Sequence, residues 1–172
     1  FRGQDFNAQL SIDIKEAYKT HKKELTVNGK KIRITIQAGI EDQQTIKITG
    51  FGGDGANNGP KGDLYITFSI LNNTAFKRVG NDLYLDYELD LYTAILGGEI
   101  TVSDFHEGKL KLKVAAGTQS GTKIRLKGKG FPIYKKEGHF GDLYINYVVK
   151  IPSQISEKEK ELFNELAQLS KK

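Results

Sequence analysis

Cysteine and methionine are both absent from the 172 residues of this chain, and histidine occurs only three times. Without cysteine the chain can form neither a disulfide framework, a thiol nucleophile nor a cysteine-ligated zinc site. Three scattered histidines leave little for another metal centre, so we expect no metal and no cofactor. The lack of methionine extends to the first position, Phe1, and we therefore expect an excised or processed fragment.

Long apolar runs are also missing. No stretch approaches the roughly 20 residues that span a membrane, and the first residues lack the pattern of a signal peptide. We therefore expect a soluble, cytoplasmic protein with no membrane partner. Lysine and arginine total 26 against 21 acidic residues, a net charge of +5, which is compatible with an anionic partner but too modest to require one.

The chain repeats itself once, with a period of about 78 residues. Gly3-Gln4-Asp5-Phe6 recurs as Gly80-Asn81-Asp82-Leu83, and each copy closes with the tetrapeptide Gly-Asp-Leu-Tyr, starting at Gly62 and at Gly141. Two long copies do not make a solenoid, which needs several short units. We therefore expect two homologous small domains in tandem.

Both copies show the period-two alternation of half-buried strands. Apolar residues alternate with basic or polar ones at Ile32, Ile34 and Ile36, and at Leu110, Leu112 and Val114. Gly39 and Gly117 follow these runs in short polar stretches, which favours hairpin connections. The expected fold class is all-β: two tandem small β-sandwich-like domains of similar topology plus a C-terminal amphipathic helix.

The segment after Pro152 changes character. Ser156 with Glu159 three positions later is a capping-box pattern that predicts a helix N-terminus. Apolar residues then form one helical stripe at Leu162, Phe163, Leu166 and Leu169. We expect this stripe to pack on the second domain or on a partner chain, because isolated short helices are marginal in water. Short helical turns are also expected near residues 16–18 and 93–96.

One glycine-rich motif, Gly50-Phe51-Gly52-Gly53-Asp54-Gly55, has the spacing of a dinucleotide-binding loop. Such a loop opens a helix whose N-terminus holds the pyrophosphate. Here a turn-rich run and a predicted strand from Leu64 to Ile70 follow instead. We therefore expect no nucleotide site.

Two aspartates, Asp63 and Asp142, could be imagined as an acid–base pair. Because they occupy the same place in the two copies, we expect each to cap a local turn by accepting from backbone N–H groups. His21, His106 and His139 have no ligand-spaced partner and are expected at surface or loop positions. No catalytic residue is predicted.

Basic residues define a candidate surface for an anionic partner. Lys123, Arg125, Lys127 and Lys129 fall on one side of a predicted strand, with Lys109, Lys111 and Lys113 on its expected neighbour. Contacts from such a face to DNA phosphates would be blind to sequence and strongly salt-dependent. The alternative is the solvated outer face of a sheet, where lysine also discourages edge aggregation.

A second candidate surface is apolar. Leu25 and Val27 alternate with polar residues after Lys23, and Ala8 and Leu10 alternate in the segment before them. If the later run is an edge strand with partly open apolar residues, an extended peptide could pair with it by strand addition. Burial of these residues in a core is the alternative that alternation alone leaves open.

Several blocks occur in a specific order: Gly3-Gln4-Asp5, Glu16-Ala17, Ala38-Gly39, residues 46–50, Gly62-Asp63-Leu64-Tyr65, residues 76–83 and residues 94–98. Together, from about Gly3 to Pro152, they resemble the C-terminal substrate-binding region of the DnaJ family. Thr20 departs from the glycine common in that family. A Cys-x-x-Cys zinc module is also missing, which places the sequence near the zinc-free members, including the curved-DNA-binding type.

The resemblance implies a non-catalytic fragment that binds unfolded polypeptides and delivers them to a DnaK-type ATPase chaperone. It implies a client-peptide-binding domain at 1–75, a second domain at 76–152 and a C-terminal helix and dimerisation segment at 153–172. Carried over by position, the peptide groove consists of Ala8, Leu10, Lys23, Leu25, Val27 and Phe76.

Two further partners follow from the resemblance. The family forms homodimers through its C-terminal segment, which assigns that role to Leu162, Phe163, Leu166 and Leu169. The resemblance to the curved-DNA-binding type implies an alternative function, DNA binding with nucleoid association. The residues that would bind DNA are Lys123, Arg125, Lys127 and Lys129. The J domain that stimulates the ATPase is not within the sequence, so this chain alone is not expected to stimulate it.

Overall fold

The structure is a computed structural model that describes residues 1–171. The first sequence copy contains β1 (Phe6–Asp13), α1 (Ile14–Ala17), β2 (His21–Val27), β3 (Lys30–Ile36), β4 (Thr45–Ile48) and β5 (Leu64–Leu71). The second contains β6 (Lys77–Val79), β7 (Asp82–Asp90), α2 (Leu91–Leu96), β8 (Gly98–Ser103), β9 (Lys109–Val114), β10 (Lys123–Leu126) and β11 (Leu143–Lys150). The last element is α3 (Glu157–Ser170). Strands dominate, which confirms the all-β prediction.

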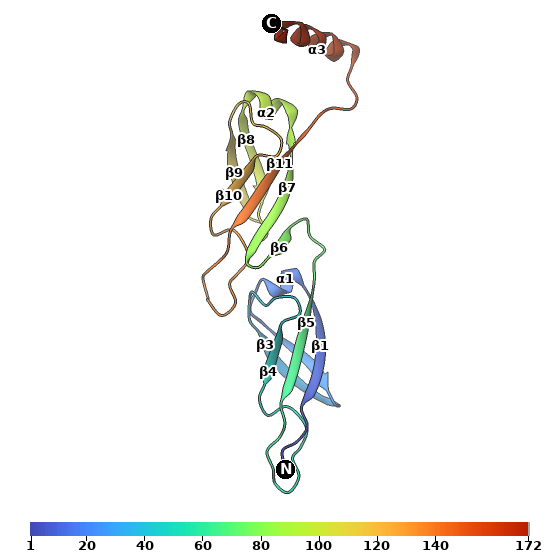
Figure 1. The fold of residues 1–172 in the computed structure, drawn as a ribbon, viewed down its shortest axis with the longest axis vertical. Helices are drawn as coiled ribbons and strands as arrows, with labels where there is room; N and C mark the ends of the chain where they lie inside the picture. The colour runs from blue at the N-terminus through green and yellow to red at the C-terminus, as the bar shows by residue number, and fades with distance from the viewer. Residues whose placement is uncertain (172) are drawn as a thin grey trace. The chain divides into compact units, whose positions relative to one another are not determined.

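The strand order repeats between the two copies. The first has a sheet in the order β1-β5-β4 and a separate β2-β3 pair; the second has β10-β11-β7-β6 and a separate β8-β9 pair. β1 lies beside β5 in parallel, as Figure 1 shows. In their register Phe6 is opposite Leu64. The equivalent strands β7, β11 and β10 occur in the same order, so the sequence repeat is also a repeat of topology.

The hairpin prediction at Gly39 and Gly117 is wrong. β3 pairs with β2, whereas β4 pairs with β5, so the chain crosses from one sheet to another at Gly39. β9 and β10 likewise belong to different sheets on either side of Gly117. Alternation fixes which face of a strand is apolar but does not say which strand lies beside it.

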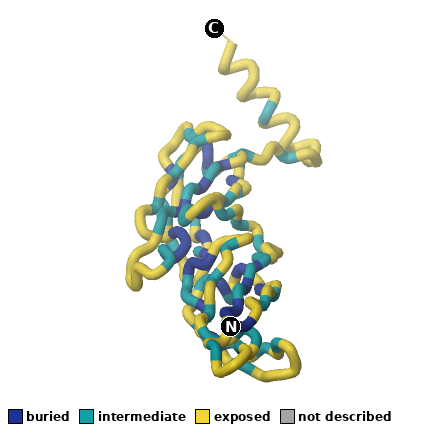
Figure 2. Tube along the Cα trace, turned by 60° about the horizontal axis from the view of Figure 1, so that its bottom comes forward, coloured by how far each residue is buried: buried dark blue, intermediate teal, exposed yellow. Residues whose placement is uncertain are grey.

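By compactness the described residues divide into two units, one formed by 1–85 with 124–145 and the other by 86–123 with the described residues from 146 onward. Buried residues of the first unit include Ile36, Leu64 and Phe68; those of the second include Val102 and Tyr147. Figure 2 shows such buried segments in dark blue. The domain limits expected at residues 75 and 152 stay a prediction.

Helical segments occur where the sequence indicates them. α2 covers the turn expected at 93–96, and α1 overlaps the turn expected at 16–18 but ends at Ala17. α3 begins with the expected capping box. The Ser156 N–H donates to Glu159 Oε1 at 3.0 Å, and the Glu159 N–H donates to Ser156 Oγ at 3.1 Å. No described residue of α3 is buried, and the helix is almost entirely yellow in Figure 2.

The apolar stripe of α3 is only partly engaged within the chain. The Phe163 ring stacks on Tyr92 of α2, with ring centroids 6.4 Å apart. Leu162, Leu166 and Leu169 are 45%, 58% and 78% exposed. Their packing on a partner chain stays a prediction.

Candidate functional site

Strand β2 has an open edge. Among the strands of residues 1–171, it is hydrogen-bonded in a sheet to β3 alone. Its residues alternate strictly: Lys22, Glu24 and Thr26 are exposed, while His21, Lys23, Leu25 and Val27 are half-buried. The apolar face of β2 is therefore neither sealed in the core nor fully open to water.

The six residues expected to line a groove share this intermediate burial. Ala8 and Leu10 lie on β1, three more lie on β2, and Phe76 follows β5; the full set is Ala8, Leu10, Lys23, Leu25, Val27 and Phe76. In the part of the chain that the structure describes, β1, like β2, has a single neighbour in its sheet, which is β5. Both strands thus present partly covered apolar residues beside an unpaired edge.

A cavity of about 440 Å³ joins the ends of these strands. Its apolar wall comes from Phe6 on β1, Val27 on β2 and Ile32 on β3, and the half-exposed Phe51 adds a fourth side chain. Lys30, Lys31 and Lys61 also line it. β1 and the β2–β3 hairpin therefore border one cavity, and Val27 connects it to the predicted groove.

Sequence reasoning missed Phe6, Ile32 and Phe51. A signal existed for two of them. Phe6 stands two residues before Ala8, which places it on the same face of β1. Ile32 begins the alternating apolar run with Ile34 and Ile36, and in the structure it lies opposite Leu25. Phe51 lies in a loop, where no periodicity indicates a direction.

The glycine-rich loop beside the cavity does not offer a phosphate site. The Gly50 N–H donates to Asp63 Oδ1 at 3.0 Å, and the Gly52 and Gly53 N–H groups donate to the Gly62 and Gln4 carbonyls at 2.8 and 2.7 Å. These donors are therefore committed to the fold. β5, rather than a helix, follows the loop.

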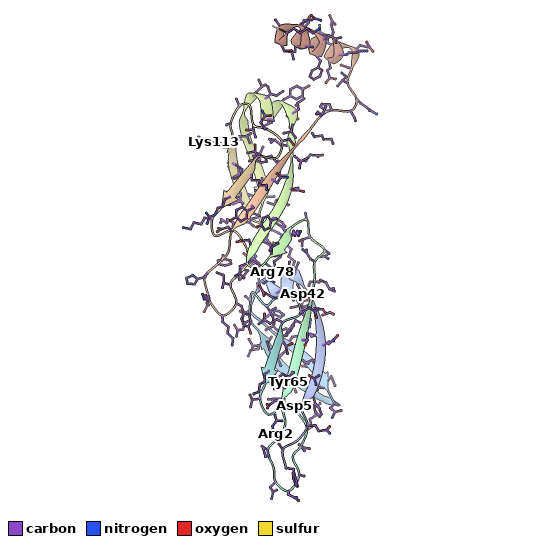
Figure 3. All side chains as sticks on the ribbon, viewed as in Figure 1. Arg2, Asp5, Asp42, Tyr65, Arg78 and Lys113 are labelled. Carbon is purple, nitrogen blue, oxygen red and sulfur yellow. The ribbon has the colours of Figure 1, made fainter. Side chains whose placement is uncertain are left out.

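The two equivalent aspartates cap turns, as expected. Asp63 accepts from the Gly50 N–H and Asp142 accepts from the Gly128 N–H at 2.9 Å. These backbone donors are the main reason why the pKa of each carboxyl lies below its usual value. Arg2 bridges Asp63 and Asp5, and Figure 3 shows Arg2 and Asp5 close together. Each aspartate therefore stabilises a turn at the equivalent place of its copy.

One charged cluster lies beside the apolar face of β2. Lys23 Nζ donates to Glu16 Oε2 at 3.1 Å, and the Asp13 N–H donates to Glu16 Oε1 at 3.1 Å. The Asp13 N–H, followed by Lys23, holds the pKa of Glu16 below its usual value. Lys23, the one formally charged residue of the predicted groove, therefore already has an intramolecular partner.

His21 differs from the expectation of a surface or loop position. It lies in β2 and is half-buried, with Nδ1 2.8 Å from the Lys19 carbonyl oxygen. Within residues 1–171, its Nε2 is buried without a hydrogen-bond partner and lies 3.9 Å from Glu16 Oε2. His106 and His139 are exposed.

The basic residues do not form the single strand face that the sequence predicted. β10 ends at Leu126, so Lys127 and Lys129 follow the strand rather than lie on it. The expectation that Lys109, Lys111 and Lys113 lie on a neighbouring strand is wrong, because β9 pairs with β8. Arg125 Nη2 lies 2.7 Å from Asp142 Oδ2 and is partly neutralised. The alternation of lysines in the sequence indicated neither the pairing of β9 with β8 nor the ion pair between Arg125 and Asp142.

Within residues 1–171, no group of three or more histidine, cysteine or acidic side chains could hold a metal ion. No helix in the same part of the chain is both long and apolar enough to cross a membrane.

Comparison with known proteins gives consistent matches. The family profile described as the DnaJ C terminal domain matches residues 6–152. A protein named Chaperone protein DnaJ from Caldicellulosiruptor saccharolyticus is 43% identical over 141 residues, covering 82% of this chain and 36% of the relative. Proteins of that name from Geobacillus sp. and Halalkalibacterium halodurans are 46% identical, covering 81% and 82% of this chain and 36% and 38% of their own lengths. The chain thus spans little more than a third of these relatives.

Proposed function

The chain belongs to the family of DnaJ C-terminal domains, and from this premise we propose that it binds unfolded polypeptides as the client-binding part of a DnaJ-type co-chaperone. The observation that carries the proposal is the partly covered apolar face of β2 beside an unpaired edge. An extended client segment adds a strand along this edge. Backbone pairing gives it affinity without sequence selectivity, and apolar side chains enter between Leu25, Val27 and β1.

The cavity extends this groove. Phe6 and Ile32 provide an apolar end to which a large client side chain can bind, and Val27 is shared between groove and cavity. Apolar burial contributes roughly 25 cal/mol per Å², so one well-covered side chain supplies about 2 kcal/mol. Weak, reversible binding of this kind suits a protein that must release its client again.

Several finer features belong to the same proposal. The client is handed to a DnaK-type ATPase chaperone by the whole co-chaperone, in the cytoplasm. The absence of cysteine supports assignment to the zinc-free class, close to the curved-DNA-binding type. A homodimer forms through α3, since Leu162, Leu166 and Leu169 are exposed apolar residues on one helix and Phe163 already contacts α2.

DNA binding is the weaker candidate. Arg125 is engaged by Asp142, and Lys127 and Lys129 lie beyond the end of β10, so the four residues Lys123, Arg125, Lys127 and Lys129 do not form one strand face. A DNA duplex serves as the competing ligand in the test below.

The test is an anisotropy titration of a fluorescent, unstructured apolar peptide. We expect Leu25→Asp to weaken binding at least tenfold, because the variant places a carboxylate in the apolar groove. Thr26→Asp is the matched control: it carries the same charge on the exposed face of the same strand and should change the Kd less than twofold.

Salt separates the two ligands. Peptide binding through apolar contacts should persist at high salt, whereas DNA binding should weaken steeply. Equal effects of Leu25→Asp and Thr26→Asp, or salt-sensitive duplex binding with no peptide binding, would overturn the proposed function.

A further inference from the structure

The predicted groove contains one formally charged side chain, Lys23, between His21 and Leu25 on the half-buried face of β2. A lone lysine beside an apolar groove attracts acidic residues of an incoming peptide. Lys23 is not alone, however, because its ammonium group donates to Glu16 Oε2 at 3.1 Å. The two side chains are 31% and 38% exposed, so an incoming peptide could reach the pair.

Glu16 is held in place by its own helix. It is the third residue of α1 and forms a capping box with Asp13, whose N–H donates to Glu16 Oε1. One carboxylate oxygen therefore serves the helix and leaves the other for Lys23. A glutamate carboxylate is an anion at neutral pH, and the Asp13 N–H and Lys23 hold the pKa of Glu16 below its usual value. The partner of Lys23 is thus already oriented and loses little freedom on pairing.

We propose that Glu16 is a specificity-determining residue of the client groove: by neutralising Lys23, it makes the groove accept apolar segments without favouring acidic ones. This inference rests on the proposed function. An acidic client residue must compete with a carboxylate that is already bound in position. Glu24 follows Lys23 on β2, but it lies on the exposed face of the strand, with its Oε1 3.9 Å from Lys31 Nζ.

The variant Glu16→Gln tests the role without removing the helix cap. A glutamine oxygen still accepts from the Asp13 N–H, because glutamine serves at the same position of a capping box. The neutral amide, however, no longer neutralises Lys23. Glu159→Gln is the matched control, since Glu159 is the equivalent capping-box residue of α3 and pairs with Ser156.

The readout is the ratio of the dissociation constants for two labelled peptides. One is neutral and apolar, and the other carries two added glutamates beside the same apolar core. A ratio cancels any general loss of stability that a variant causes. In the wild-type chain we expect the two peptides to bind within about twofold of each other.

In Glu16→Gln, the acidic peptide should gain about fivefold over the neutral one, the factor that a partly screened ion pair contributes. The gain should disappear in the double variant Glu16→Gln/Lys23→Met and at 1 M salt, where the Debye length is about 3 Å. Glu159→Gln should leave the ratio unchanged.

Two failures are distinguishable. If both peptides bind the wild-type chain but Glu16→Gln leaves their ratio unchanged, Glu16 does not set the specificity and the proposed function stands. If neither peptide binds the wild-type chain, the proposed function fails and this inference fails with it. A gain that persists in the double variant would also overturn the assignment, because the added attraction would not come from Lys23.

Discussion

Replacing Arg78 by methionine should strongly destabilise the chain, because the Arg78 guanidinium binds three carbonyls at once. Nη1 donates to the Ile40 oxygen at 2.6 Å, Nη2 to the Gly39 oxygen at 2.8 Å and Nε to the Gly80 oxygen at 2.9 Å. The guanidinium carbon also lies 3.9 Å from the centroid of the buried Phe131 ring.

The magnitude follows from what methionine leaves unpaired. Gly39 and Ile40 are buried, and each carbonyl deprived of its donor costs about 1–3 kcal/mol. Gly80 is exposed and recovers a water. The lost cation–π contact adds about 1 kcal/mol. Burial lowers the pKa of Arg78, which means that desolvation of its charge offsets part of the stability that these contacts contribute. We expect Arg78→Met to lower the free energy of unfolding by about 3 kcal/mol.

Urea unfolding followed by circular dichroism measures this change. Arg78→Lys should cost less, about 1–2 kcal/mol, since an ammonium keeps the charge but cannot span the same three carbonyls. Arg33→Met is the control, because Arg33 is exposed on β3 and its loss should change stability little. If Arg78→Met and Arg33→Met destabilise equally, the reasoning from buried carbonyls is wrong.

Three further outcomes follow from the structure. Gly39→Ala should cost more than about 2 kcal/mol of stability, since the new Cβ would lie 2.4 Å from the Pro132 oxygen. Gly117→Ala meets no atom within 4 Å and should cost about 1 kcal/mol for its positive φ. Equal urea midpoints for the two variants would contradict this difference. The lowered pKa values of Asp63 and Asp142 stabilise the fold above the unfolded value near 3.9, and this stability is lost as pH falls through the lower folded values. An Asp63→Asn/Asp142→Asn variant should therefore lose less stability on acidification, and an acid-unfolding curve parallel to that of the wild type would be inconsistent with the caps. Leu166→Asp should convert dimers to monomers in sedimentation equilibrium, while an unchanged dimer mass would refute the role of α3.

Local features were predictable from the sequence. The capping box at Ser156 and Glu159 depends on residues three apart, and the aspartate caps follow from the repeat that places Asp63 and Asp142 equivalently. Period-two alternation indicated correctly which residues of β2 share a face. In each case the information lies within one short segment or in a comparison of two copies.

Strand partners were not predictable in the same way. β1 pairs in parallel with β5, although α1, β2, β3 and β4 lie between them in the sequence. No local pattern encodes that choice of partner. The Lys23–Glu16 pair joins residues on different elements, β2 and α1, and depends on how the chain turns between them. Cavity residues such as Phe51 come from loops without periodicity.

The central claim, that an extended client pairs with the open edge of β2, is tested most directly by amide hydrogen exchange with and without saturating apolar peptide. The account predicts that alternate backbone N–H groups of residues 21–27 become protected, because only alternate amides of an edge strand point outward. The equivalent strand β8 provides the internal reference. Protection confined to β8, to β10 or to α3, with β2 unchanged at saturation, would contradict the account.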